Sequence, residues 1–154
     1  MVKKLSYFKF FLNFVCEMTT LQVKSALKDP KRVLLALGSN VDKWHHLSYA
    51  VAQLRQRWHV VWQSDILETE AVGMEAPSFC NMLVVLAVEN TTYEALHALL
   101  KEMECAMGSS WEERKRGYVV IDLDILAFQS QRYHQADWSR PYVRTLLQSM
   151  PFEW

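Results

Sequence analysis

The segment from Val119 to Leu126 places two aspartates at alternate positions of an otherwise apolar run, and this pattern constrains the fold most. Residues two apart in a β-strand lie on the same face, so Asp122 and Asp124 share one face and the apolar residues between them share the other. By the rise of a strand, the two aspartates stand about 7 Å apart along the backbone. The pattern predicts a strand with one face in the core and the other at a polar site.

The remaining apolar segments predict an alternation of strands and helices. Runs of β-branched and aromatic residues favour strands, whereas apolar residues at spacings of three and four favour helices. We expect strands at residues 33–37, 60–69, 79–88 and 119–126, helices at 47–54 and 93–107, a charged connection at 111–116, and a short helix near 142–149. The order β-α-β-β-α-β predicts an α+β protein of the ferredoxin-like type, an antiparallel sheet with helices on one face and the other face free for a site.

The second long helix carries signals at both of its ends. Thr91 or Thr92 is expected to cap its N-terminus, because a threonine hydroxyl accepts a hydrogen bond from a free backbone N–H of the first turn. Gly108 stands where a helix C-terminus favours a residue in the left-handed conformation. The two signals place this helix between the third and fourth strands.

Length and composition indicate one domain with a sizeable core. The chain has 154 residues, of which 51% are hydrophobic. Its 17 basic and 17 acidic residues balance, which argues against nucleic acid or an anionic membrane as the main partner. The three cysteines lack metal-binding or redox spacing, which favours a reducing compartment. We therefore expect a cytoplasmic protein.

The first residues of the chain do not fit the domain pattern. Residues 1–17 contain lysines followed by an apolar run that a lysine and an asparagine interrupt, and no small-residue cleavage site follows, so neither secretion nor a membrane span is supported. The segment is a short surface helix, a weak membrane-surface segment, or sequence upstream of a natural start at Met18. We treat residues 1–31 as an N-terminal extension, either spurious or loosely ordered, and residues 32–154 as the domain.

The paired aspartates suggest metal chemistry. Two carboxylates on a strand that enters a core are costly unless a cation compensates them, and Mg²⁺ or a Mg²⁺-triphosphate would do so. The alternative is that Asp122 and Asp124 face water and form surface ion pairs with Arg114, Lys115 and Arg116. The same basic run could neutralise a polyphosphate, although such a run is more often a solvated loop.

Asn81 interrupts the apolar run of the third strand. A buried amide needs hydrogen-bond partners, and Phe79 lies two residues away on the same strand face. The pair could therefore recognise a flat heterocycle, with the amide on its polar edge and the ring stacked on it. The alternative is an amide that bonds to the backbone of a neighbouring loop.

Two polar loops complete the set of candidates. His134 lies in a loop with Asp137 and Arg140, which makes it the histidine best suited to a site. The turn Gly38-Ser39-Asn40 follows the first strand, where its backbone donors could face a ligand. A turn of this composition usually only ends a strand.

In this order, the motifs resemble the hydroxymethyldihydropterin pyrophosphokinase family of the folate pathway. These enzymes transfer a pyrophosphoryl group from ATP to the hydroxymethyl group of a reduced pterin. The resemblance runs from about Val33 to Tyr142 and rests on the segments Ala36–Asn40, Ser64–Thr69 with Val72-Gly73, Phe79–Asn81, Glu104 with Gly108, and Ile121–Leu126. The ordered series is more specific than any of its members.

The resemblance implies a set of roles for residues of this chain. Asp122 and Asp124 would hold two Mg²⁺ ions that bridge ATP, and the pterin hydroxyl would attack the β-phosphorus in line. The nucleotide contacts implied are Glu104, His134 and Arg140. The pterin contacts implied are Thr69, Val72, Phe79, Asn81 and Tyr142. The partners expected are ATP and a reduced pterin, with no nucleic acid and no membrane, and the protein is expected to be a monomer or weak dimer.

The sequence departs from the family pattern just before the first aspartate. The family places Pro-Arg where this chain has Tyr118 and Val119, so an arginine that stabilises the transferred group is absent. Ser109 replaces a basic residue, and the connection to His134 is shorter than usual. Loss of such an arginine costs about two to five orders of magnitude in rate unless another cation replaces it. We expect the basic run at residues 114–116 to supply that replacement and to count among the catalytic residues.

Three functions are compatible with these observations. The first is a pterin pyrophosphokinase, and the second is a catalytically silent module of the same fold that binds pterin or nucleotide. The third is an unrelated ferredoxin-like interaction domain in which the Asp-Leu-Asp strand is incidental. The missing arginine favours the silent module, whereas the intact aspartate pair and Asn81 favour retained ligand chemistry.

Overall fold

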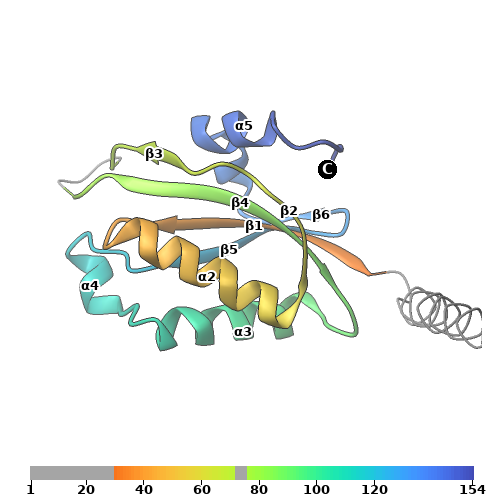
Figure 1. Ribbon diagram of the computed structural model, residues 1–154, viewed down its shortest axis with the longest axis horizontal. Coiled ribbons are helices and arrows are strands. Elements are labelled where there is room, and N and C mark those ends of the chain that lie inside the picture. Colours follow the sequence, from red (N-terminus) through yellow and green to blue (C-terminus); the bar gives the residue numbers. More distant parts are fainter. Residues whose placement is uncertain (1–29, 72–75) are drawn as a thin grey trace, which may run out of the picture. The chain divides into compact units, whose positions relative to one another are not determined.

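The computed structural model describes residues 30–71 and 76–154, whose strands form one antiparallel sheet (Figure 1). The strands are β1 (Lys31–Ser39), β2 (His59–Gln63), β3 (Leu67–Thr69), β4 (Phe79–Val88), β5 (Asp122–Phe128) and β6 (Gln131–Arg132). They lie in the order β2-β4-β1-β5-β6, and β3 also pairs with β4. The predicted extension at residues 1–31 falls almost entirely outside the described residues.

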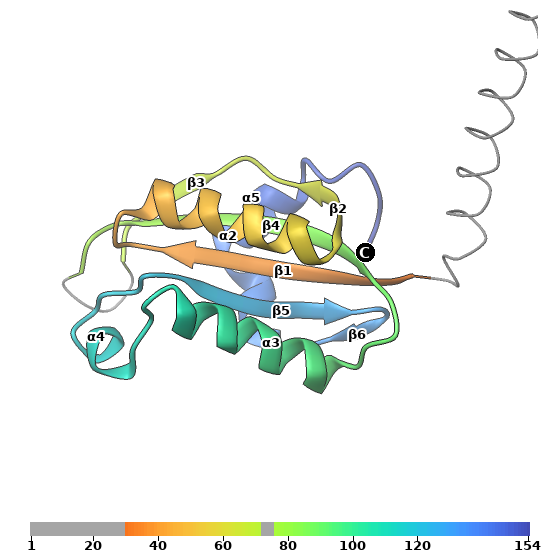
Figure 2. The same cartoon turned by 60° about the horizontal axis from the view of Figure 1, so that its bottom comes forward.

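The helices lie on both faces of the sheet. They are α2 (Lys43–Arg57), α3 (Tyr93–Ala106), α4 (Trp111–Lys115), the 3₁₀-helix η1 (Gln135–Ser139) and α5 (Pro141–Leu147). The two long helices α2 and α3 cover one face, and α5 lies against the opposite face (Figures 1 and 2). The α+β class is therefore confirmed, but the prediction of helices on one face holds for α2 and α3 and is wrong for α5.

The central strands β1 and β4 are apolar along most of their length, as expected for strands with both faces buried. In β1, Val33, Leu35 and Leu37 belong to the core under α2 and α3. Leu34 and Ala36 belong to a second core that α5 covers. The core thus has two layers, and α5 leaves part of the second face available for a site.

Helix α3 begins and ends at the predicted signals. The Thr92 hydroxyl accepts a hydrogen bond from the backbone N–H of Ala95 at 3.2 Å, which selects Thr92 over its neighbour as the cap. Gly108 follows the helix with φ of 95°, a conformation that favours glycine. Leu100 is fully buried, whereas Leu99, which the periodicity also includes, is 41% exposed.

The strand expected at residues 60–69 is interrupted. The backbone N–H of Ser64 donates to the carbonyl of Leu83, and the Ser64 hydroxyl accepts from the N–H of Leu83, both at 2.9 Å. A serine side chain therefore takes the place of a ladder partner, and the chain continues as β3 three residues later. The interruption moves β3 towards the end of β4 that carries Asn81.

The segment before β5 also differs from the prediction. The expected charged connection at 111–116 contains the short helix α4, which Ser110 caps by accepting from the N–H of Glu113 at 3.2 Å. The strand expected from Val119 begins only at Asp122. Neither β6 nor η1 was predicted. In the part of the chain that is described, the helices are too short or too polar to cross a membrane.

Neighbouring leucines of α3 test which of its faces packs on the sheet. Leu100→Ala should lower the free energy of unfolding by about 3 kcal/mol, because it leaves a cavity in the core. Leu99→Ala should lower it by less than about 1 kcal/mol, because that side chain is half exposed. Urea denaturation followed by circular dichroism measures both values. Equal losses would contradict the orientation of α3.

Candidate functional site

A pocket of about 680 Å³ opens on the sheet face opposite α2 and α3. It lies over the ends of β1, β4 and β5 and is bordered by the segment after β3 and by the start of α5. Its lining residues are Ala36, Leu37, Gly38, Thr69, Glu70, Ala71, Phe79, Asn81, Asp122, Asp124, Asp137, Arg140, Pro141 and Tyr142. A pocket of this size suits a small-molecule ligand.

The two aspartates of β5 both line this pocket, as their alternation predicts. Asp122 lies opposite Gly38 of β1, and Asp124 lies opposite Ala36, so small residues leave the space beside the carboxylates open. Burial, together with the negative charge of Asp122, raises the pKa of Asp124 above its ordinary value. A bound cation would reverse this effect by favouring the charged carboxylate.

The amide of Asn81 is buried at the other side of the pocket. Its Nδ2 donates to the Thr69 hydroxyl at 2.8 Å, so its partner is a side chain rather than a loop backbone. A Cβ at Gly38 would stand 3.3 Å from Asn81 Oδ1 and 3.9 Å from the ring of Phe79, which explains glycine at that position. Tyr142 of α5 lines the same pocket. The structure therefore brings together four of the predicted pterin contacts, while Val72 lies outside the described residues.

The residues of the predicted basic run point in different directions. Arg114 Nη1 donates to Asp122 Oδ1 at 3.1 Å, and its Nη2 donates to Glu104 Oε2 at 3.2 Å. Lys115 lies over the ring of Trp111, and Arg116 pairs with Glu113. Of the three cations, the described contacts bring Arg114 alone to the aspartate pair.

Glu104 of α3 is buried behind the edge of β5 rather than in the pocket lining. Its Oε1 accepts hydrogen bonds from the backbone N–H of Leu123 at 2.6 Å and from Lys101 Nζ at 2.7 Å. The Lys101 ammonium also lies 3.4 Å from Asp124 Oδ1 and 3.7 Å from Asp122 Oδ1. Sequence reasoning missed Lys101, because its one sequence signal, a spacing of three from Glu104, is also typical of exposed helix pairs.

The protonated form of Lys101 is stabilised by this environment. Burial by itself would lower the pKa of the ammonium, but the hydrogen bond to Glu104 and the charges of Glu104, Asp124 and Asp122 outweigh that effect. The pKa of Lys101 therefore lies above its ordinary value. The lysine brings a positive charge to the paired carboxylates at neutral pH.

The polar loop after β6 reaches the same carboxylates. Possible ligand atoms of Asp124, His134 and Asp137 lie within 4.8 Å of one another. Asp137 forms an ion pair with Arg140, with 2.7 Å between Oδ1 and Nε, and both residues line the pocket. His134 stands beside the lining, and Asp137 is a pocket residue for which the sequence predicted no role.

Hydrogen bonds from the turn after β1 hold the segment that leads into β5. Asn40 Nδ2 donates to the carbonyl of Gly117 at 2.7 Å, and its Oδ1 accepts from the N–H of Val119 at 2.6 Å. The Ser39 hydroxyl donates to the carbonyl of Val120 at 2.6 Å. These bonds replace strand pairing and explain why β5 begins after residue 121. Ser39 and Asn40 of the turn therefore position the aspartates, while Gly38 of the same turn lines the pocket.

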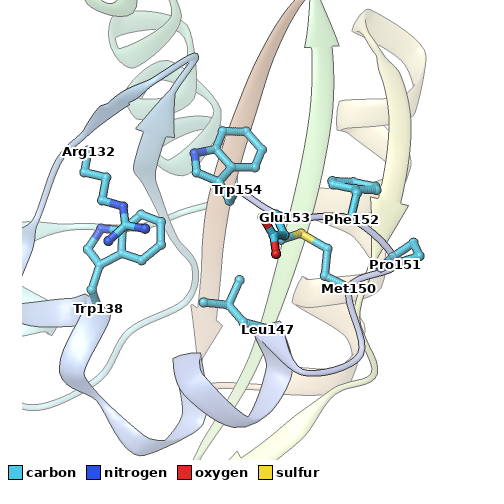
Figure 3. A pocket seen from close by; sticks show the side chains of 8 residues that line it. All are labelled: Arg132, Trp138, Leu147, Met150, Pro151, Phe152, Glu153 and Trp154. Atoms are coloured by element: carbon cyan, nitrogen blue, oxygen red, sulfur yellow. The ribbon is translucent and has the colours of Figure 1, made fainter.

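A second pocket, of about 540 Å³, lies beside α5 near the end of the chain (Figure 3). It is lined by Arg132, Trp138, Leu147, Met150, Pro151, Phe152, Glu153 and Trp154. The guanidinium of Arg132 lies 4.2 Å from the centre of the Trp138 ring. None of the predicted site residues lines this pocket.

Fold and pocket together define an α+β protein with a small-molecule site on one face of an antiparallel sheet. The family model described as 7,8-dihydro-6-hydroxymethylpterin-pyrophosphokinase (HPPK) matches residues 34–151, and the chain belongs to this family. A search of curated proteins finds no match. Membership confirms the resemblance seen in the sequence and supports a pyrophosphokinase role in folate synthesis. Proteins of this family generally use ATP, Mg²⁺ and a pterin.

Two arginines of one segment test the charge arrangement. Arg114→Ala should lower the free energy of unfolding by about 1–3 kcal/mol, because Glu104 is a buried carboxylate that loses a donor. Arg116→Ala should change it by about 0.5 kcal/mol or less, because its pair with Glu113 is exposed. Chemical denaturation of the two variants measures the difference. A larger loss for Arg116→Ala would contradict the assigned contacts.

Proposed function

We propose that this protein transfers a pyrophosphoryl group from ATP to 6-hydroxymethyl-7,8-dihydropterin in a Mg²⁺-dependent reaction of folate synthesis. The observation that carries the proposal is that one pocket holds both halves of the required site. The lining includes the Asp122–Asp124 pair for metal binding, and Asn81 with the rings of Phe79 and Tyr142 for a heterocycle. The family match over residues 34–151 supports the same reaction.

The pterin half of the proposed site is built for a flat, polar heterocycle. Phe79 and Tyr142 come from different elements and line the pocket, so a ring can stack between aromatic surfaces. Asn81 and Thr69 supply adjacent polar groups, already joined by a hydrogen bond, that can read the edge of the ring. Val72 remains a proposed contact on the resemblance alone.

The metal half of the proposed site has the donors that Mg²⁺ prefers. Asp122 and Asp124 offer hard carboxylate oxygens on one strand face, and burial together with the negative charge of Asp122 raises the pKa of Asp124, a cost that a bound cation would relieve. When bound, two Mg²⁺ ions would neutralise charge on the triphosphate of ATP. Mg²⁺ dependence and the number of ions are part of the proposal.

The protein's own groups act mainly by positioning in this scheme. The pterin hydroxyl would lose its proton to solvent as its oxygen forms a bond to the β-phosphorus, the bond from that phosphorus to the α-phosphate oxygen would break, and AMP would leave. We assign Arg140 and His134 to the nucleotide side, since Arg140 lines the pocket and His134 lies beside Asp124. Glu104 would act indirectly, because it holds Lys101 and Arg114 in place.

Arg114 is the proposed replacement for the missing arginine of the family pattern. It contacts Asp122 directly, whereas Lys115 and Arg116 are engaged elsewhere. The second candidate function, a catalytically silent module that binds pterin or nucleotide, is favoured by one observation, which is Val119 at the arginine position. Both functions require the same pocket, and turnover separates them.

The order β2-β4-β1-β5, with α2 and α3 as the connecting helices on one face, supports a ferredoxin-like arrangement. ATP as a substrate and free thiols at Cys80 and Cys105 support a cytoplasmic location. We further propose a monomer or weak dimer, with the extension expected at residues 1–31 ending before Lys31, which is the first residue of β1.

The direct test is AMP release from Mg²⁺-ATP with and without 6-hydroxymethyl-7,8-dihydropterin. Pterin-dependent AMP is expected from the wild type, and Asp124→Asn should reduce it by at least about a hundredfold, because the metal ligand is lost. Asp65→Asn is the matched control, since Asp65 is exposed outside the pocket. A folded protein that binds ATP and pterin without releasing AMP would establish the silent module instead.

Asn81→Ala tests the pterin half by itself. The variant should bind the pterin at least about tenfold more weakly, because the buried amide that reads the ring edge is lost. Its affinity for a Mg²⁺-ATP analogue should stay within about twofold of the wild type and serves as the internal control. Calorimetric titration measures both affinities. Equal losses for the two ligands would show that Asn81 is a structural amide.

A further inference from the structure

Five charged groups meet at the edge of β5 that no strand of the described sheet covers beside Leu123. The carboxylates of Asp122, Asp124 and Glu104 face the cations of Lys101 and Arg114, and each contact spans 3.7 Å or less. Three negative charges and two positive charges leave one negative charge uncompensated. Binding of a divalent cation would make the cluster positive, which suits a polyphosphate.

The two cations of this cluster are held very differently. The Arg114 guanidinium donates to Asp122, to Glu104 and to the backbone carbonyl of Ile121, so its planar fork is fixed by three acceptors. The Lys101 ammonium has one short contact, to Glu104 at 2.7 Å, whereas its hydrogen bonds to Asp124 and to the backbone carbonyl of Leu123 are both 3.4 Å long and its distance to Asp122 is 3.7 Å. Its side chain is also 37% exposed. Lys101 can therefore leave the aspartates without losing its bond to Glu104.

We propose that Lys101 is an exchangeable counter-ion of the aspartate pair, which gives up the carboxylates to a divalent cation and then contacts the phosphates of the bound nucleotide. The inference rests on the proposed function, because it takes the pocket as a metal-nucleotide site. A lysine suits this role, since its ammonium is a compact charge on a flexible stem. Glu104 acts as the anchor that keeps the ammonium within reach of both positions.

Two opposite effects follow from this assignment. In the free protein, Lys101 competes with a metal ion for the oxygens of Asp122 and Asp124, so it weakens metal binding. In the nucleotide complex, the same ammonium adds a charge-assisted hydrogen bond to phosphate, so it strengthens nucleotide binding. A lysine with a purely structural role would shift both affinities in the same direction or leave both unchanged.

The test compares Lys101→Met with the wild type in two binding experiments that need no turnover. Electron paramagnetic resonance measures Mn²⁺ binding to the free protein, and calorimetry measures binding of Mg²⁺ with α,β-methylene-ATP, in which the scissile bond cannot break. The variant should bind Mn²⁺ about threefold more tightly, because a partly exposed competing charge is removed. It should bind the nucleotide analogue about tenfold more weakly, because a charge-assisted contact is lost.

Two further variants make the outcome specific. Lys101→Arg keeps the positive charge and should return both affinities towards the wild-type values. Arg57→Met removes one charge from the exposed end of α2, where its partner is Gln53, and should change neither affinity. Thermal melting shows that each variant is folded.

Each result has a defined meaning. Parallel weakening of both ligands, or no change in either, would overturn the exchange role while leaving the proposed function intact. A folded wild-type protein that binds neither Mn²⁺ nor the nucleotide analogue would overturn the proposed function and the exchange role together.

Discussion

The pairing of Gly38 with both neighbouring strands is the constraint on which the pocket depends. In the antiparallel register, Gly38 lies opposite Asn81 on β4 and opposite Asp122 on β5. Two strand spacings therefore separate the buried amide from the first carboxylate, a span of about 10 Å. A one-residue slip in either register would turn one of these side chains towards α2 and α3. Because Gly38 has no side chain, the space between the amide and the carboxylate stays open.

The edge of β5 leaves a backbone N–H without a strand partner in the described sheet. The side chain that accepts this hydrogen bond also positions the charged groups of the site. The N–H of Leu123 points away from β1, where no strand follows at this level of the described sheet. Glu104 accepts this hydrogen bond and thereby satisfies the edge. The same buried carboxylate holds Lys101 and Arg114 beside the aspartates. One residue of α3 therefore both completes the hydrogen bonding of the β5 edge and holds the two cations beside the aspartates.

The sequence predicts those features that arise from local periodicity. Alternation places Asp122 and Asp124 on one face, and helical spacing with a threonine cap locates α3 closely. Features that depend on tertiary contacts were missed, such as the break at Ser64, which needs the backbone of Leu83 as its partner. Lys101 was missed for the same reason. A lysine three residues before a glutamate is typical of an exposed helix pair, and only the packing of α3 against β5 brings it to the aspartates.

Val119 stands where the family pattern has an arginine, and this difference affects the charge of the site more than the backbone geometry. The N–H of Val119 donates to Asn40 Oδ1, and its carbonyl accepts from the backbone N–H of Asn40, so the backbone here is held by contacts that no side chain at position 119 supplies. A residue without charge therefore leaves the approach to β5 intact and removes a cation from the site. The positive charge in contact with Asp122 and Asp124 comes from Arg114 and Lys101, whose positions depend on Glu104, and Arg140 adds a further positive charge to the pocket lining. In the proposed function, the difference between catalysing the transfer and only binding the ligands therefore rests on charge, and Lys101 of α3 and Arg114 of α4 are the cations in contact with the aspartates.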